Sequence, residues 1–239
     1  MPPRDPLPIT LCLTLGGRPD HLRRTLASLL VDSPFAAVLA INDFRDEASS
    51  AVFRAACPMG TLIVPPRRLG HHAAVDVLYR NVQTPYVFHC EDDWLFVRPL
   101  DWRPMLRLLN RNQRMTQLCL RRVEDFRMPA RELRLMRTIV DKDITYVRLD
   151  DGQPHWHGYT FNPHLASMEL WRDLGGFSAY RSEWDLSSGL RNQGRFVAYL
   201  YPGACTHIGG DRSMASPVQR GGWKRWLRWP AGASTRRLF

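Results

Sequence analysis

The stretch Ile9-Thr10-Leu11-Cys12-Leu13-Thr14-Leu15, which ends at Gly16-Gly17, decides the fold class of this chain. Its residues are mostly apolar or β-branched, as is typical of a buried strand, and the two glycines predict a tight turn. Pro19 and the leucines that follow it at helical spacing predict a helix directly after the turn. A strand, a turn and a helix in this order form the first half of a βαβ unit.

The same alternation of apolar runs and helical patterns continues along the chain. Further strands are expected at 37–41, 61–64, 86–89, 117–120, 159–163 and 195–201. Helices are expected at 19–30, 51–56, 71–82, 102–111, 130–138, 168–174 and 187–192. Strands that alternate with helices of this length favour a parallel sheet covered on both faces. The predicted fold class is therefore α/β, a mostly parallel sheet flanked by helices.

The composition is that of a globular protein. Of the 239 residues, 44% are apolar and 23% are charged, which excludes disorder as the main property of the chain. Five cysteines form no CxxC pair, and four of them lie in apolar runs, which favours buried thiols in a reducing compartment. No apolar run reaches about 18 residues and no leader pattern is visible, so we expect a cytoplasmic protein.

The net charge of +10 is concentrated at the C-terminal end. Residues 211–239 hold seven Lys or Arg and one Asp, a net charge of +6, and we expect them to form a basic, Trp-rich tail after a catalytic domain at 1–210. In a helix, apolar and basic side chains of this tail would fall on opposite sides: Trp223, Trp226 and Leu227 against Lys224, Arg225 and Arg228. Such a helix at 218–239 fits an anionic membrane surface, at the inner face of the cell membrane, or packs its tryptophans on the catalytic domain.

Polar residues follow each of the first four predicted strands. They are Gly16-Gly17-Arg18, Asp43, Arg67-Arg68 and Glu91-Asp92-Asp93. Ligands of open parallel sheets bind beyond the carboxyl ends of the strands, so these four loops are expected to converge on one site. The alternative is that loops between strands and helices are simply polar.

The acidic triplet Glu91-Asp92-Asp93 lies between two apolar stretches. Adjacent carboxylates repel one another and lose hydration on burial, and a divalent cation relieves both costs. Oxygen ligands at alternate positions suit Mg²⁺ or Mn²⁺ that bridges to phosphates, whereas an acidic helix cap or a solvated turn needs no metal. His207 is a candidate to complete an Asp-based metal shell, and His155 and His157 form a weaker pair.

A second acidic segment, Glu183-Trp184-Asp185, stands at the start of a predicted helix. The helix N-terminus stabilises a carboxylate there, so Asp185 is also explained as a capping residue. Trp184 beside Glu183 indicates a partly enclosed site, in which the carboxylate pKa rises toward the range of a general base. The motifs of serine hydrolases, zincins, P-loop proteins and dinucleotide-binding proteins are missing from the sequence.

The order and spacing of these segments resemble the GT-A glycosyltransferases, which have a Rossmann-like sheet, and especially their family-2-like inverting group. Residues 13–29 are similar to the first strand and helix of that group, and Ile41-Asn42-Asp43 is similar to the segment that carries its nucleotide-binding acid. Glu91-Asp92-Asp93 is similar to its DxD motif, although the first Asp is Glu91 here. The other similar segments are Leu69-Gly70 and Thr84-Pro85-Tyr86-Val87-Phe88 before the DxD motif, and Leu174-Gly175-Gly176-Phe177, Glu183-Trp184-Asp185-Leu186 and Cys205-Thr206-His207 after it. The resemblance covers roughly 9–208.

The resemblance implies transfer of a sugar from a nucleotide-diphosphate sugar to a hydroxyl of a glycan, lipid-linked or cell-surface acceptor, with inversion. Glu91, Asp93 and His207 would hold Mn²⁺ or Mg²⁺ on the diphosphate. Glu183, with Asp185 nearby, would deprotonate the acceptor hydroxyl. The substrate-binding residues would be Leu15, Gly16, Arg18, Asp43, Arg67, Arg68, Asp92 and Trp184.

Two other functional classes fit parts of the sequence. A sugar-nucleotide nucleotidyltransferase shares the sheet and the metal carboxylates, but it needs a glycine-rich basic first loop, and Gly16-Gly17-Arg18 is too sparse. A non-enzymatic nucleic-acid-binding protein fits the net charge and the eight tryptophans. Because the charge is concentrated in the tail and is not interleaved with aromatic residues along a groove, no nucleic-acid partner is expected.

Overall fold

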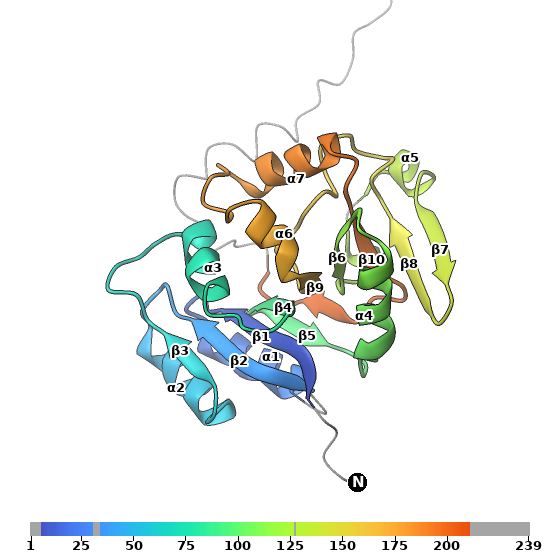
Figure 1. Cartoon of the computed structure of the whole chain (residues 1–239). Coiled ribbons are helices and arrows are strands. Elements are labelled where there is room, and N and C mark those ends of the chain that lie inside the picture. Colours follow the sequence, from blue (N-terminus) through green and yellow to red (C-terminus); the bar gives the residue numbers. More distant parts are fainter. Residues whose placement is uncertain (1–5, 31–33, 127, 211–239) are drawn as a thin grey trace, which may run out of the picture.

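The structure is a computed structural model in which residues 6–30, 34–126 and 128–210 are described. Within these ranges nine strands form one sheet, in the order β3-β2-β1-β4-β9-β6-β10-β8-β7 (Figure 1). In this spatial order the strands are Thr61–Ile63, Phe35–Ile41, Leu7–Thr14, Tyr86–Glu91, His164–Ser167, Met115–Cys119, Phe196–Leu200, Ile144–Arg148 and Arg137–Asp141. A second, two-stranded sheet pairs Trp94–Phe96 (β5) with Cys205–His207 (β11).

The large sheet is mostly parallel, as predicted. Strands β3, β2, β1 and β4 run parallel to one another, and β10 runs parallel to β6. Strand β9 lies between β4 and β6 and is antiparallel to both. Strand β8 pairs antiparallel with β10 and with the edge strand β7. The carboxyl ends of β1, β2, β3 and β4 therefore meet at one edge of the sheet.

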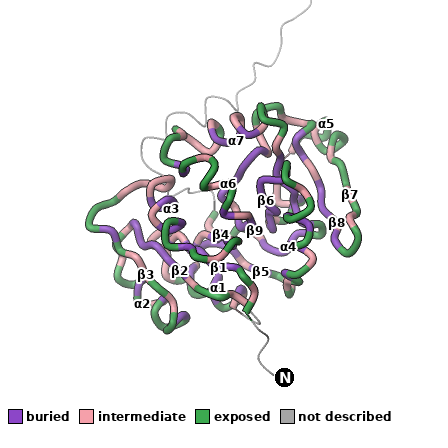
Figure 2. The backbone as a smooth tube through the Cα atoms, in the orientation of Figure 1, coloured by how far each residue is buried: buried purple, intermediate pink, exposed green. Residues whose placement is uncertain are grey.

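Helices cover both faces of the sheet. They are Pro19–Leu29 (α1), Glu47–Ala56 (α2), His71–Tyr79 (α3), Trp102–Arg111 (α4), Ala130–Leu133 (α5), Met168–Asp173 (α6) and Glu183–Asn192 (α7). Helices α1, α2 and α4 share one apolar core with Leu11 and Leu13 of β1, whereas α3, α6 and α7 share the other with Cys12. Side chains alternate along a strand, so β1 serves both cores, which explains its unbroken apolar run. The buried strands and the exposed outer sides of the helices are visible in Figure 2.

Two of the expected elements are wrong. The helix expected at 130–138 ends at Leu133, and Arg137–Asp141 forms the edge strand β7. An edge strand pairs on one side only and tolerates charged residues, so its sequence lacks a clear strand pattern. The strand expected at 159–163 is irregular backbone, and β9 begins only at His164. Pro163 has no N–H to donate to a neighbouring strand, which explains the later start.

Asp76 of α3 fixes the turn that leads toward α7. Its Oδ1 accepts hydrogen bonds from Trp171 Nε1 and from Phe177 N, each at 2.8 Å, and its Oδ2 accepts one from Ser178 N at 2.9 Å. Burial raises the pKa of Asp76, but the hydrogen bonds from Ser178 and Trp171 outweigh it and lower the pKa. A Cβ at Gly176 would lie 3.0 Å from both carboxylate oxygens, so glycine permits this close approach.

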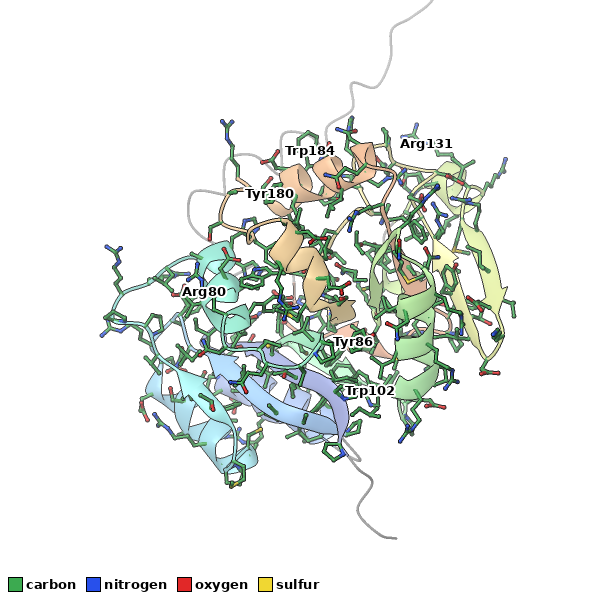
Figure 3. All side chains as sticks on the ribbon, viewed as in Figure 1. Arg80, Tyr86, Trp102, Arg131, Tyr180 and Trp184 are labelled. Carbon is green, nitrogen blue, oxygen red and sulfur yellow. The ribbon has the colours of Figure 1, made fainter. Side chains whose placement is uncertain are left out.

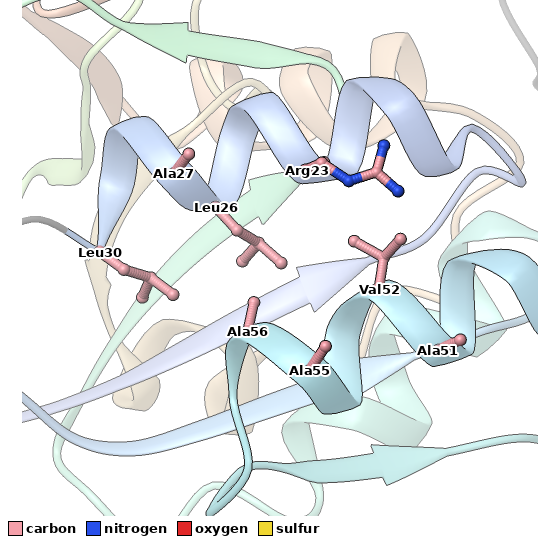
Figure 4. A pocket seen from close by; sticks show the side chains of 8 residues that line it. All are labelled: Arg23, Leu26, Ala27, Leu30, Ala51, Val52, Ala55 and Ala56. Carbon is pink, nitrogen blue, oxygen red and sulfur yellow. The ribbon is translucent and has the colours of Figure 1, made fainter.

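An open groove of about 680 Å³ lies between α1 and α2 (Figure 4). Its walls are small and apolar side chains, among them Leu26 and Ala27 of α1 and Val52 and Ala55 of α2, with Arg23 at its edge. None of the residues that line it is a predicted site residue. The groove is therefore separate from the candidate active site described below.

The five cysteines are all free and buried, as the sequence predicted. No helix in the described parts of the chain has the length and apolar character needed to cross a bilayer. The expected basic tail at 211–239 lies outside the described residues, so the tail and the domain boundary before it stay predictions.

Candidate active site

Asp92 joins the turn after β4 to the turn after β1. It is fully buried, and its Oδ2 accepts a hydrogen bond of 2.6 Å from Gly16 N while its Oδ1 accepts one of 2.8 Å from Arg18 Nη2. Burial raises the pKa of Asp92 more strongly than the positive charge of Arg18 lowers it. The structure thus brings Gly16, Arg18 and Asp92 together, as the convergence of loops at one sheet edge predicted.

Asp93 joins the same turn to the C-terminal part of the described chain. One oxygen, Oδ2, lies 2.7 Å from Arg18 Nη1 and 2.7 Å from His207 Nε2. The other, Oδ1, is buried and has no hydrogen-bond partner among the described residues. Burial raises the pKa of Asp93, but the hydrogen bond from His207 and the charge of Arg18 outweigh it, so the pKa is lowered. The pairing of β5 with β11 places His207 opposite Trp94, which explains how residues so distant in sequence meet.

Glu91, the third predicted metal ligand, makes no hydrogen bond with Asp93 or His207 in the part of the chain that the structure describes. It is still part of β4, and its carboxylate accepts a hydrogen bond of 3.3 Å from Trp94 Nε1. Burial, reinforced by the negative charge of Asp93, raises the pKa of Glu91 to about 8. Within the described residues no group of three or more His, Cys, Asp or Glu side chains is arranged to hold a metal ion. The structure brings Asp93 into contact with His207 and Glu91 into contact with Trp94, and the assignment of all three as metal ligands stays a prediction.

Asp93 and His207 nevertheless fit a divalent cation as a two-residue ligand set. The unpartnered, buried Oδ1 of Asp93 is an acceptor without a donor, and a buried acceptor of this kind needs an explanation. Mg²⁺ at phosphate sites is commonly held by one or two carboxylates, with the remaining ligands from water and the phosphates. The donor set of this chain is compatible with that arrangement and not with a cage made of protein ligands alone.

Glu183 faces the same region from α7. Burial raises its pKa, and this effect is opposed by hydrogen bonds from the Thr160 hydroxyl and the Phe161 backbone N–H and by the charge of Arg121. The negative charge of Glu183 in turn raises the pKa of Glu91, so the two carboxylates interact across the site. A raised pKa is compatible with a general base, and the catalytic role of Glu183 stays a prediction.

The two residues after Glu183 differ in their surroundings. Asp185 donates its backbone N–H to Ser182 Oγ at 3.2 Å, and its Oδ2 accepts from Arg181 N at 3.1 Å. These contacts are those of a helix-capping residue, which the sequence left open, and the catalytic role of Asp185 stays a prediction. Trp184 is 44% exposed at the start of α7 (Figure 3), and its ring centroid lies 5.5 Å from that of His155.

The side chains of Asp43 and Leu15 both make contacts within the protein. The Asp43 carboxylate accepts hydrogen bonds from Leu69 N at 2.6 Å and from Gly70 N at 3.0 Å, so it fixes the loop before α3. Leu15 is buried in the core, so its side chain is not available to a ligand, and its role in substrate binding stays a prediction. Any contact from Leu15 to a substrate would come from its backbone.

The Phe44 ring connects the exposed loop after β3 with the turn after β1, because it contacts residues of both. Three side-chain atoms of Phe44 lie 3.6 Å from the position of a Cβ at Gly17. The guanidinium of Arg68 lies 4.1 Å from the centre of the same ring, a cation–π contact. Arg67 is exposed on the same loop. Arg68, Phe44 and Gly17 therefore form a continuous surface beside Arg18.

Arg121 was missed by the sequence analysis. Its Nη1 donates to Asn162 Oδ1 at 2.9 Å and its Nη2 to the Asp125 carbonyl at 3.1 Å, and its guanidinium lies 4.2 Å from the Phe126 ring centre. Its positive charge opposes the rise in the pKa of Glu183. The available signal was its position directly after the strand expected at 117–120, which is the rule that identified the other four loops.

Comparison with solved structures shows the same fold in two glycosyltransferases of the GT-A type. The first is GalNAc-T7 with UDP, GalNAc and Mn²⁺, with a TM-score of 0.58 and 11% identity over 84% of this chain and 44% of that one. The second is the mannosyltransferase PcManGT from Pyrobaculum calidifontis with GDP-Man and Mn²⁺, with a TM-score of 0.54 and 12% identity over 94% of this chain and 61% of that one. No family model and no curated protein matches the sequence. The chain has the GT-A fold and spans roughly half of the length of these two structures.

Proposed function

We propose that this protein is a glycosyltransferase that moves a sugar from a nucleotide-diphosphate sugar to an acceptor hydroxyl, with a divalent cation at the diphosphate. The observation that carries the proposal is the meeting of Asp93 and His207 at the carboxyl ends of the strands, with the carboxylate of Glu183 near enough to Glu91 to raise its pKa. The GT-A neighbours support it, because both were solved with Mn²⁺ and with UDP or GDP-Man.

The residues divide the reaction between a leaving-group side and an acceptor side. Asp93 and His207 would hold Mn²⁺ or Mg²⁺, which when bound offsets the charge that develops on the departing nucleoside diphosphate. Gly16, Arg18 and Asp43 would lie at the nucleotide, with Arg67 and Arg68 on the adjoining loop. Asp92 would act through Arg18 and Gly16, which it holds by hydrogen bonds.

On the acceptor side, Glu183 would take the proton of the attacking hydroxyl. One base and one stabilised leaving group suffice for a single in-line displacement, so we propose that the anomeric configuration is inverted. The exposed ring of Trp184 beside Glu183 offers an apolar surface to an acceptor sugar. We propose a glycan as the acceptor, either lipid-linked or part of a cell-surface polysaccharide.

A thermal-shift screen tests the donor class. We expect UDP or GDP, or one of their sugar conjugates, to raise the melting temperature only when Mn²⁺ is present. At a ligand concentration of 100 times Kd the expected rise is about 5–10 °C for a domain of this size. A nucleotide that stabilises the protein equally without metal, or the failure of every nucleotide diphosphate, would contradict the proposal.

Replacement of Arg121 tests the assignment of Glu183 as the base. In Arg121→Gln the pKa of Glu183 is expected to rise further, because the cation that opposes this rise is lost. A base works when deprotonated, so the acid limb of the kcat/KM profile should move to higher pH, with recovery of activity at alkaline pH. Arg122→Gln is the matched control, since Arg122 is half-exposed and lies near Glu124. An unchanged acid limb in Arg121→Gln would contradict the electrostatic role.

We also propose that the basic tail contacts an anionic membrane surface at the inner face of the cell membrane. The arrangement of tryptophans and cations in residues 218–239 supports it. The full chain should co-sediment with vesicles that contain anionic lipid, less so at high salt, and a chain without residues 218–239 should remain in the supernatant. Equal binding of the two chains would remove the membrane from this proposal.

A further inference from the structure

The guanidinium of Arg18 lies between the two aspartates of the acidic triplet. Nη2 is 2.8 Å from Asp92 Oδ1, and Nη1 is 2.7 Å from Asp93 Oδ2. The aspartate side chains are at most 3% exposed and that of Arg18 is 19% exposed, so these are largely desolvated ion pairs. Arg18 is therefore a cation that pairs with both Asp92 and Asp93 in the free protein.

Two glycines enclose this guanidinium. A Cβ at Gly209 would lie 2.2 Å from Asp93 Oδ2 and 2.6 Å from Arg18 Nη1. A Cβ at Gly16 would lie 3.1 Å from Arg18 Nη2 and 3.1 Å from Asp92 Oδ1. The backbone thus closes over the ion pairs on two sides. A side chain at Gly209 would require Asp93 or Arg18 to shift, and one at Gly16 would be tightly packed against them.

The ligands proposed for the divalent cation are occupied in this arrangement. Asp93 Oδ2 lies 2.7 Å from Arg18 Nη1 and 2.7 Å from His207 Nε2, so each of the two proposed ligand atoms already has a protein partner. A metal ion at Asp93 meets the positive charge of Arg18 at short range. The other carboxylate oxygen, Asp93 Oδ1, is buried and has no hydrogen-bond partner in the described part of the chain.

We propose that Arg18 holds the cation position in the free protein and that a divalent cation must displace it from Asp93. Arginine binds phosphate as well as carboxylate through paired N–H donors, so a diphosphate gives the displaced guanidinium a replacement anion. Metal and nucleoside diphosphate then bind cooperatively, and Mn²⁺ alone binds weakly. The cooperativity of metal and nucleotide depends on the proposed function, because it requires a nucleoside diphosphate as the donor. The competition between Arg18 and the metal ion does not depend on it.

Titration of the full chain with Mn²⁺, followed by the electron paramagnetic resonance signal of the free ion, tests this competition. Arg18→Met should bind Mn²⁺ alone at least about ten-fold more tightly than the parent protein, because a like charge close to the metal is removed. Arg18→Lys, which retains a charge for folding but cannot bridge both carboxylates, should gain a smaller but measurable factor. Arg24→Met, an exposed position on α1, is the control for net charge.

Two further measurements distinguish a failure of the proposed competition from a failure of the proposed function. Asp93→Asn in the Arg18→Met background should abolish the gain, which locates it at Asp93. If neither Arg18 variant binds Mn²⁺ more tightly than Arg24→Met does, the proposal is overturned. Addition of UDP or GDP should tighten Mn²⁺ binding by the parent protein more than by Arg18→Met. If neither nucleotide binds while the gain in metal affinity is present, the competition stands and the proposed function is at fault.

Discussion

Asp93→Asn is expected to lower metal-dependent sugar transfer by at least about 10²–10³-fold, the cost of removing one group that stabilises the developing charge on the leaving group. The amide is uncharged, so it is a poor ligand for Mn²⁺ and a poor partner for Arg18 and His207. In the parent protein both contact the same oxygen, each at 2.7 Å. Donor turnover with increasing Mn²⁺ is the measurement, and excess metal should restore little of the activity.

The control for this variant must exclude loss of folding. Asp143→Asn removes an exposed aspartate that pairs with Arg107 at 3.1 Å, and it should leave turnover unchanged. Circular dichroism and thermal melts of Asp93→Asn should show a folded protein, since Arg18 retains its contact with Asp92. Unchanged turnover in a folded Asp93→Asn protein would contradict the assignment of Asp93 as a metal ligand.

The first half of the fold could be predicted because its signals are local. Strand β1, the turn after it and helix α1 can each be predicted from a short run of consecutive residues. The parallel direction of the strands from β1 to β4 follows from the helices that connect them. The insertion of β9 between β4 and β6 could not be predicted, because pairing of distant strands depends on both partners. The β7–β8 hairpin was missed because its exposed, Arg-rich edge resembles a helical surface.

In the candidate site, too, some features could be predicted from the sequence, whereas contacts that depend on the orientation of side chains could not. Convergence of the turns at Gly16 and Asp92 follows from parallel strands that end at one edge, and it was predicted. The hydrogen bond from the indole of Trp94 to Glu91 could not be read from the motif, because it depends on how the two side chains are oriented in the fold. Arg121 was missed because its interaction with Glu183 exists only after β6 and α7 are placed in the same fold.

Glu183→Gln is expected to lower the rate of transfer by about 10²–10⁴-fold while donor binding changes by no more than about two-fold. Glutamine has the shape of glutamate and keeps an acceptor oxygen for Thr160 and the Phe161 N–H, so the start of α7 should keep its position. It accepts no proton from an acceptor hydroxyl. The measurements are the transfer rate with donor and acceptor, and the nucleotide-dependent thermal shift in Mn²⁺.

The pH dependence makes this prediction specific to a base. Burial raises the pKa of Glu183, so the carboxylate becomes available only above the ordinary range of glutamate, and transfer by the parent protein should fall as the pH decreases through that raised pKa. In Glu183→Gln the small residual rate of transfer should no longer fall as the pH decreases through this range. Glu169→Gln, an exposed position in the first turn of α6, should retain both the rate and its fall with decreasing pH. If donor binding and transfer fall together in Glu183→Gln, Glu183 has a structural role and the base lies elsewhere.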